Sequence, residues 1–281
     1  MIGRLWTLYR VELSKLLARR LLWVGAVLVI LLALAGPSLS GAAAAARAAA
    51  EGSAGGDEFQ NGWTVLAGSV TRASFLIWLL AVVLSASSVA EEASWGTLRV
   101  ICARPVRRAE WIAAKVLALW SLTAAILLAA VFAATASAEL AFGLYDVVDP
   151  LFPDRVTHSF GDMRWFVLAA TGASLVPLLA LIGVGTFCST LVDHPGHATG
   201  AAVGALVLLS AAGGLSPGFG EYSFVDQLFV PFRLVNDLAN QYTGKLREFN
   251  EDLPRVVWVS GLWAIAGTQL AALRLTLRDV V

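Results

Sequence analysis

Six apolar stretches, each about as long as a membrane crossing, constrain this chain more than any other feature of its sequence. A helix that crosses the hydrocarbon core of a bilayer needs about 20 consecutive, mostly apolar residues. The six stretches are Leu21–Leu39, Ala73–Ala90, Val116–Ala138, Trp165–Val192, Ala198–Leu215 and Val256–Leu273. The sequence therefore predicts an all-α polytopic membrane protein with six transmembrane helices.

The composition supports this class and excludes several others. Apolar residues make up 58% of the chain and charged residues 14%, against roughly 45–50% and about 25% in soluble domains. Twenty basic residues are balanced by twenty acidic ones, which argues against nucleic-acid binding by bulk charge. Cys102 and Cys188 form no CxxC or Cys/His pattern, so neither a disulfide framework nor a metal site is expected. Pro177 lies inside the fourth stretch, where we expect a kink because neighbouring helices can satisfy the freed carbonyl.

The distribution of Lys and Arg predicts how the chain is oriented. An even number of spans places both termini on one side, together with the connections near 91–115 and 193–197. That side holds twelve basic and six acidic residues, so the positive-inside rule places both termini in the cytoplasm. Seventeen Arg against three Lys, with frequent Ala, is typical of a GC-rich bacterial genome. We therefore expect a multi-pass protein of the bacterial cell (inner) membrane.

Residues 1–20 have the pattern of an amphipathic helix that precedes the six-span domain of residues 21–281. At 100° per residue, an apolar sector faces a polar one, and such a helix lies flat on the cytoplasmic interface. The interpretation is an elbow helix against which a partner docks, or an anchor that only orients the first span. The apolar sector contains Ile2, Leu5, Trp6, Tyr9, Leu13, Leu16 and Leu17, and the polar sector contains Arg4, Glu12, Lys15 and Arg19.

The longest outer connection, residues 216–255, is not uniformly polar. Its part Phe224–Leu238 consists of short apolar pieces separated by Pro231. This pattern predicts two short re-entrant helices that lie in or dip into the outer interface before the sixth span.

The connection Glu91–Lys115 is longer than a simple cytoplasmic turn needs to be. Two carboxylates, Glu91 and Glu92, end the second span, and Gly96 permits a sharp change of direction. Lys115 can snorkel at the start of the third span. A short amphipathic helix with charged ends fits this pattern, either as a docking element or as a linker.

One motif in this connection resembles a known family. Glu92-x-x-x-Gly96-Thr97-Leu98 is followed by an apolar pair, by Arg-Pro-Val-x-Arg at 104–108, and by a Lys that opens the next span. This is similar to the signature between spans two and three of type 2 ATP-binding-cassette (ABC) permeases, the exporter family. The amphipathic elbow helix, the six spans and the short helices before span six agree with that architecture. The chain departs from the usual pattern at Cys102 and Arg107.

The resemblance implies a non-catalytic permease subunit that dimerises and is driven by a separate cytoplasmic ABC ATPase. No G-x-x-x-x-G-K-[ST] phosphate loop occurs in the sequence, so ATP and Mg would be bound by the partner, and this chain would hold no cofactor. In that family the 91–115 connection is the coupling helix, which sits in a groove of the ATPase. The ATPase-coupling residues implied here are Glu91, Glu92, Gly96, Thr97, Leu98, Arg99, Val100, Ile101, Arg104, Pro105, Val106, Arg107 and Arg108.

Three weaker signals remain. Gly200 and Gly204 form a small-xxx-small pattern that allows close helix approach, or that arises by chance in an Ala/Gly-rich chain. The resemblance favours a dimer interface there. Glu139, near the outer end of the third span, is either a solvated rim residue or a substrate or proton site. The His194 and His197 pair lacks further ligands, so no metal site is expected.

The predicted function is export of a hydrophobic or amphipathic substrate by a permease in contact with a second copy, the ATPase and membrane lipid, without nucleic acid. Two alternatives stay open: an ion-coupled secondary transporter, and a membrane assembly or scaffold protein without its own transport cycle. A secondary transporter should carry paired ionisable groups in mid-span, and the sequence shows no such pair. A neighbouring gene for a P-loop ATPase would favour the permease.

Overall fold

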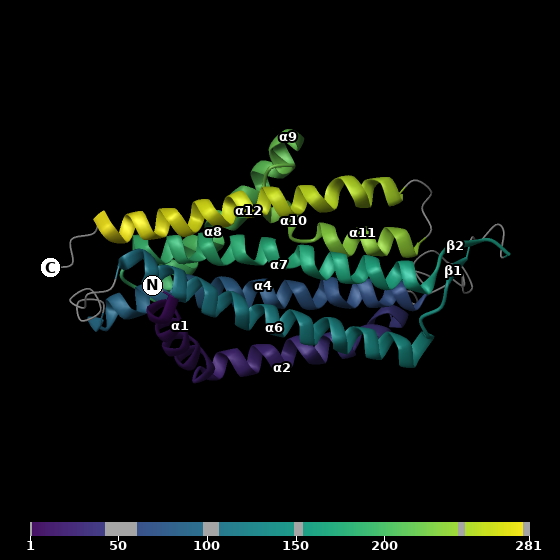
Figure 1. Cartoon of the computed structure of the whole chain (residues 1–281), viewed down its shortest axis with the longest axis horizontal. Helices are drawn as coiled ribbons and strands as arrows, with labels where there is room; N and C mark the ends of the chain where they lie inside the picture. Colours follow the sequence, from purple (N-terminus) through teal and green to yellow (C-terminus); the bar gives the residue numbers. More distant parts are fainter. Residues whose placement is uncertain (1, 43–60, 98–106, 149–153, 241–244, 278–281) are drawn as a thin grey trace.

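The computed structural model describes residues 2–42, 61–97, 107–148, 154–240 and 245–277. Long helices lie side by side in an elongated bundle (Figure 1). Helix α1 and the last turns of α12 lie at one end of the bundle, called the terminal end below, and a small β-hairpin lies at the other, the hairpin end (Figure 1). The long elements are α1 (Ile2–Leu17), α2 (Arg20–Leu34), α4 (Gly62–Ser94), α6 (Arg108–Phe142), α7 (Phe160–Leu191), α8 (Pro195–Leu215) and α12 (Lys245–Leu277).

Five of the predicted spans lie within single long helices, α4, α6, α7, α8 and α12, that are apolar enough to cross a membrane. A sixth is obtained if α1 and α2, bent by 73° at Ala18 and Arg19, are counted together. The chain is therefore a helical transmembrane protein. Pro177 lies inside α7 without ending it. Helix α4 has 33 residues and a length of about 50 Å at 1.5 Å per residue, so it exceeds a hydrocarbon core of about 30 Å.

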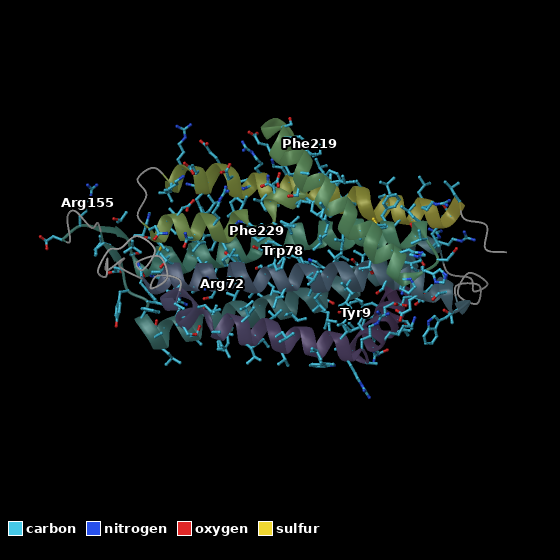
Figure 2. The ribbon with its side chains drawn as sticks, turned by 180° about the vertical axis from the view of Figure 1, so that it is seen from behind. Tyr9, Arg72, Trp78, Arg155, Phe219 and Phe229 are labelled. Carbon is cyan, nitrogen blue, oxygen red and sulfur yellow. The ribbon has the colours of Figure 1, made fainter. Side chains whose placement is uncertain are left out.

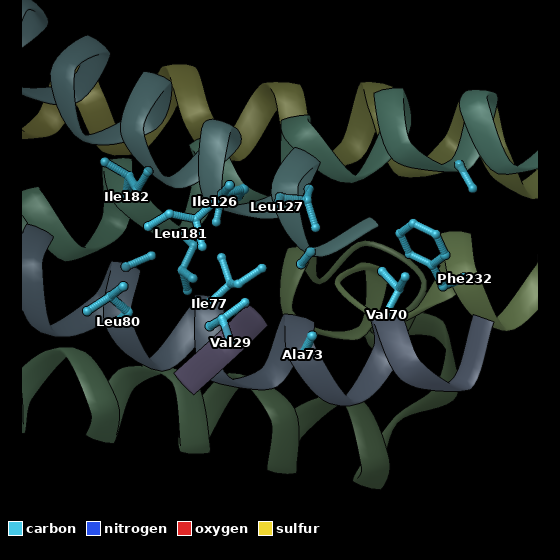
Figure 3. Close-up of a cluster of buried hydrophobic side chains, with 14 of the residues drawn as sticks. Val29, Val70, Ala73, Ile77, Leu80, Ile126, Leu127, Leu181, Ile182 and Phe232 are labelled. Atoms are coloured by element: carbon cyan, nitrogen blue, oxygen red, sulfur yellow. The ribbon is translucent and has the colours of Figure 1, made fainter. Parts of the chain in front are cut away.

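Helix α4 forms the centre of the bundle and contacts α2, α6, α7 and α8. Its buried residue Ile77 lies in the hydrophobic core close to Val29 of α2 and Leu181 of α7 (Figure 3). Helices α7 and α12 approach each other through glycines. A Cβ added at Gly267 would lie 2.7 Å from the carbonyl carbon of Gly183, so the two backbones are in direct contact.

Some shorter elements between the long helices were predicted from the sequence only in part. Strands β1 (Val147–Val148) and β2 (Val156–His158) pair antiparallel, a small exception to the all-α prediction. Three short helices follow α8, namely α9 (Pro217–Gly220), α10 (Phe224–Gln227) and α11 (Val230–Ala239). Two short helices were expected around Pro231, but this proline lies in the first turn of α11. That position suits proline because the first turn leaves its missing N–H without a helical partner.

The buried face of α1 differs from the predicted one. Glu12 was placed in the exposed polar sector, but only 5% of it is exposed, whereas Trp6 of the apolar sector is 59% exposed. Leu16 is buried, and the Tyr9 hydroxyl lies 2.9 Å from Ser121 Oγ of α6. The helix is therefore turned toward α6 on its Glu12 side. The physical reason is the charge partner that α6 offers to Glu12.

Candidate functional site

A buried ion pair joins α1 to α6 at the terminal end. Lys115 Nζ donates to Glu12 Oε2 over 2.7 Å, and only 4% of Lys115 is exposed. The ammonium also lies 4.8 Å from the ring centroid of Trp111, one helical turn earlier on α6. The sequence predicted that Lys115 would snorkel to the interface, but its charge is instead neutralised inside the protein. A charge buried this deeply persists only where it is paired and hydrogen-bonded.

Two further side chains close this pair into a network that includes α4. Lys115 Nζ donates to Glu92 Oε1 over 2.9 Å. Lys15 Nζ donates to Glu12 Oε1 over 2.9 Å and to Glu92 Oε1 over 3.0 Å. We call Glu12, Lys15, Glu92 and Lys115 the charge cluster. It holds two cations and two carboxylates, so its net charge is zero.

A second contact reinforces the charge cluster where the chain bends between α1 and α2. Arg19 Nη2 donates to Glu91 Oε2, and Arg19 Nη1 donates to Ser87 Oγ over 3.4 Å. A cavity of about 20 Å³ lies among Glu12, Lys15, Arg19, Glu92, Lys115 and their neighbours Leu16, Ser88 and Leu119. Three elements that are far apart in the sequence therefore meet at one set of charges.

Helix α4 presents its two carboxylates because α7 fixes its last turns. Ser189 Oγ of α7 accepts from the backbone N–H groups of Val89 and Ala90, both over 2.9 Å. The helix then ends at Ser94 with Trp95 as its C-cap, and Gly96 has a φ of +70°. That left-handed conformation costs glycine little. The backbone thus leaves the helical conformation at Gly96, and the direction that the chain takes after Thr97 lies outside the described residues.

Burial and charge pairing compete in setting the proton affinities of the cluster residues on α1. Burial alone would raise the pKa of Glu12, but the neighbouring Lys115 and Lys15 hold it below its usual value. Burial would also lower the pKa of Lys15, but hydrogen bonds to Glu12 and Glu92 hold it above its usual value. Both groups therefore stay charged at neutral pH.

The predicted coupling residues divide into three groups. Glu91 and Glu92 belong to the ion pairs above, and Thr97 Oγ1 donates to the Glu92 carbonyl over 3.1 Å. Arg107 is exposed, as expected of a residue that contacts a partner. Leu98, Arg99, Val100, Ile101, Arg104, Pro105 and Val106 lie outside the described residues.

Arg108 has an internal role that the sequence did not indicate. Its Nη1 donates to the backbone carbonyl of Leu275, and also to that of Thr276 over 3.2 Å. These are carbonyls at the end of α12, where a cation is favourable because the helix dipole is negative there. Arg108 thus ties the start of α6 to the last turn of α12, at the same end of the bundle as the charge cluster.

The other predicted site residues lie apart from the cluster. Gly200 and Gly204 are exposed on α8, and a Cβ at either would meet nothing within 4 Å. Glu139 is exposed and accepts from the backbone N–H of Leu144 over 2.9 Å, a position that fits a rim residue. His194 and His197 are exposed, and the described residues contain no group of three potential metal ligands.

Sequence reasoning missed Glu12, Lys15 and Arg19 as site residues, and it did not consider Arg72. One signal was present for Glu12: at 100° per residue it lies only about 20° from Leu5 on the helical wheel. It therefore borders the apolar sector rather than opposing it. Each of the four residues has a partner outside its own helix, which periodicity within one segment does not reveal.

A family described as "Protein of unknown function (DUF2705)" matches residues 46–250. These residues include all of α4, α6, α7, α8 and α11, and thus two of the three helices that form the charge cluster. No curated protein matches the chain. Because the family match covers well over half of its residues, the chain belongs to the DUF2705 family.

Proposed function

We propose that this chain is the permease subunit of an ATP-driven ABC exporter, with Glu91–Lys115 as the segment that couples it to a cytoplasmic ATPase. The observation that supports the proposal is the charge cluster. Glu92 and Lys115 flank the segment on its two sides, and both are bonded to side chains of α1. A force on the segment would therefore move α1, α4 and α6 together.

Contacts around the charge cluster would connect the coupling segment to two further helices that could cross the membrane. Arg19 lies at the bend between α1 and α2, so its bond to Glu91 connects the segment to α2. Arg108 connects it to α12. Breaking or shifting these bonds would change how the helices pack, as an alternating-access cycle requires. Both termini would lie in the cytoplasm, as the charge distribution predicts.

The proposed partner in the membrane is a second copy of the chain. Helix α8 is the least buried of the long apolar helices, and its glycines at 200 and 204 leave the backbone open to close approach. The substrate class we propose is hydrophobic or amphipathic.

The test is reconstitution of the chain with a P-loop ATPase encoded beside it. Leu98→Ala combined with Ile101→Ala should reduce co-purification of the ATPase and its stimulated ATP hydrolysis in liposomes, because apolar interface anchors can contribute about 2 kcal/mol or more each. Arg107→Ala is the control: an exposed ion pair contributes roughly 0–1 kcal/mol, and its effect should fade at high salt. Arg108 is left intact because it also holds α12.

Full assembly and stimulation in the Leu98→Ala and Ile101→Ala variant would refute the proposal. Transport driven by an ion gradient without any ATPase would instead establish the secondary transporter. A chain that assembles with partners but moves no substrate under either energy source would be a scaffold.

A further inference from the structure

Arg72 is a half-buried cation of α4 with little to bind inside the protein. Its Nη2 lies 3.5 Å from the carbonyl oxygen of Gly36, at the outer limit of a hydrogen bond. Its Nε is buried and has no partner. Among the described residues no carboxylate interacts with it. An arginine in a membrane helix is costly to keep in this state, and such residues usually mark a functional site.

The position of Arg72 along α4 matches the far boundary of the membrane. Residues 73–90 contain no charged side chain, and Glu91 follows them. Glu91 lies 19 positions after Arg72, which is about 28 Å of helix at 1.5 Å per residue. A hydrocarbon core is about 30 Å thick. Arg72 therefore lies about one hydrocarbon thickness away from the charge cluster along α4, toward the hairpin end (Figure 2), a spacing that fits a cation at the headgroup level of the opposite boundary.

The guanidinium is held in place by close helix packing. A Cβ added at Gly36 would lie 1.7 Å from Ser69 Oγ, so the chain just after α2 is pressed against α4 one turn before Arg72. A Cβ at Gly68 would lie 3.5 Å from Arg72 Nη1. These two glycines therefore leave the cation bordered by backbone instead of bulky side chains.

An apolar strip continues from Arg72 toward the middle of the membrane. Phe75 and Leu79 follow at helical spacing and are 58% and 50% exposed. They are the only exposed side chains of α4 between residues 62 and 90, a stretch that the structure describes completely. The other side chains of α4 in this stretch are buried or partly buried, so the helix has a single exposed strip. This strip has the Arg72 cation at one end and the apolar side chains of Phe75 and Leu79 beside it.

We propose that this strip binds an amphiphile with an anionic head and an apolar chain. The head, a phosphate or a carboxylate, binds the Arg72 guanidinium, which suits planar oxyanions because its N–H groups form a fork. The apolar chain lies over Phe75 and Leu79. This site requires no ATPase and does not rest on the proposed coupling. The ligand comes either from the bilayer, as an anionic lipid, or from the cell, as a cargo.

The probe for the test is radiolabelled dodecyl phosphate, added to the whole protein in maltoside micelles. Arg72→Gln should weaken binding about tenfold or more, because hydrogen bonds to charged groups are strong. Arg72→Lys should weaken it less. Arg233→Gln is the matched control: it removes the same charge from an exposed position on α11 and should leave the affinity unchanged. Unlabelled dodecanol, which lacks the anion, should compete poorly.

A second variant keeps the test valid if Arg72→Gln fails to fold. Phe75→Ala combined with Leu79→Ala changes exposed side chains only, and should weaken binding of dodecyl phosphate several-fold. Equal affinity of the parent and the folded variants, or equal competition by dodecanol, would show that Arg72 is only a topological anchor and would overturn the proposal.

Two further arms identify the source of the ligand once binding is shown. Displacement of the probe by phosphatidylglycerol in nanodiscs, with no effect of ATP, identifies a bilayer lipid. Release of the probe on ATP hydrolysis by the assembled complex identifies a cargo. Failure of ATPase assembly would leave the binding result intact, so the two proposals fail separately.

Discussion

Replacing Lys115 by methionine tests whether the charge cluster holds the terminal end of the bundle together. In the parent protein, Lys115 and Glu12 are buried, with 5% and 7% of their side chains exposed. Without Lys115, two carboxylates share one cation, Lys15, whose side chain is 45% exposed. Removing one partner of a buried ion pair costs about 3–5 kcal/mol. We expect Lys115→Met to lose this much free energy of unfolding.

The double variant separates charge pairing from packing. Glu12→Met together with Lys115→Met leaves one cation and one carboxylate, Lys15 and Glu92, which are 3.0 Å apart. Apolar residues of similar volume often replace a buried ion pair at little cost. The double variant should therefore unfold within about 1 kcal/mol of the parent. Because Glu12→Met alone should be destabilising for the same reason as Lys115→Met, the two single costs together should exceed the cost of the double variant by several kcal/mol, and this difference is the coupling energy between the two sites.

The assay is unfolding by a denaturing detergent in maltoside micelles, followed by tryptophan fluorescence. Lys245→Met is the control, because the Lys245–Glu248 pair at 2.6 Å is solvent-exposed and, as an exposed ion pair, should contribute little to stability. If Lys115→Met cost no more than this control, or if the double variant were as unstable as the sum of the single ones, the cluster would not stabilise the fold by charge pairing.

Four further predictions address pH, packing, subunit association and orientation. The pKa of Glu12 is lowered in the folded protein and that of Lys15 is raised. Their contribution to the free energy of unfolding should therefore be constant near neutral pH, fall in acid as Glu12 is protonated, and fall at high pH as Lys15 is deprotonated. The free energy of unfolding measured against pH should vary less for the double methionine variant. Gly267→Ala should lose roughly 1–3 kcal/mol of free energy of unfolding because its Cβ meets backbone 2.7 Å away. Gly204→Leu should unfold like the parent but weaken subunit association. If its elution and cross-linking were unchanged, α8 would not be part of the interface. With Cys102 and Cys188 replaced, a cysteine at Thr243 should react with an impermeant thiol reagent from outside and one at Thr276 should not; labelling of the latter in intact cells would reverse the orientation.

The sequence predicted the helical spans well because their signal is local. A long apolar run indicates a span without any knowledge of its neighbours, and α7 runs through Pro177 as expected. The hairpin was missed because strands as short as Val147–Val148 and Val156–His158 have no detectable period. Arg72 was missed for a related reason. The predicted second span began at Ala73, which treated Arg72 as part of a connection, although α4 begins at Gly62, ten residues before Arg72.

The sequence predicted the carboxylates that α4 contributes to the candidate site, but not the side chains that α1 and its bend to α2 contribute. Glu91 and Glu92 follow from the motif, but their partners Lys15 and Arg19 come from another helix. Two charged residues 77 positions apart give no sequence pattern that distinguishes a buried pair from two solvated side chains. Tertiary packing determines whether the two side chains form a buried pair or stay solvated, because a charge buried in the protein requires a partner and a solvated charge does not.

The structure also divides the basic residues at the terminal end by what they can do. Lys15 and Lys115 are neutralised inside the charge cluster, and Arg108 is bonded to the end of α12. Arg10, Arg20 and Arg107 are exposed, so their charge reaches the surroundings. In the proposed permease, the positive excess that would orient the chain and attract an acidic partner therefore comes from exposed arginines such as these. Salt should weaken partner binding through them while leaving the pair of Lys115 and Glu12, whose side chains are 5% and 7% exposed, almost unaffected.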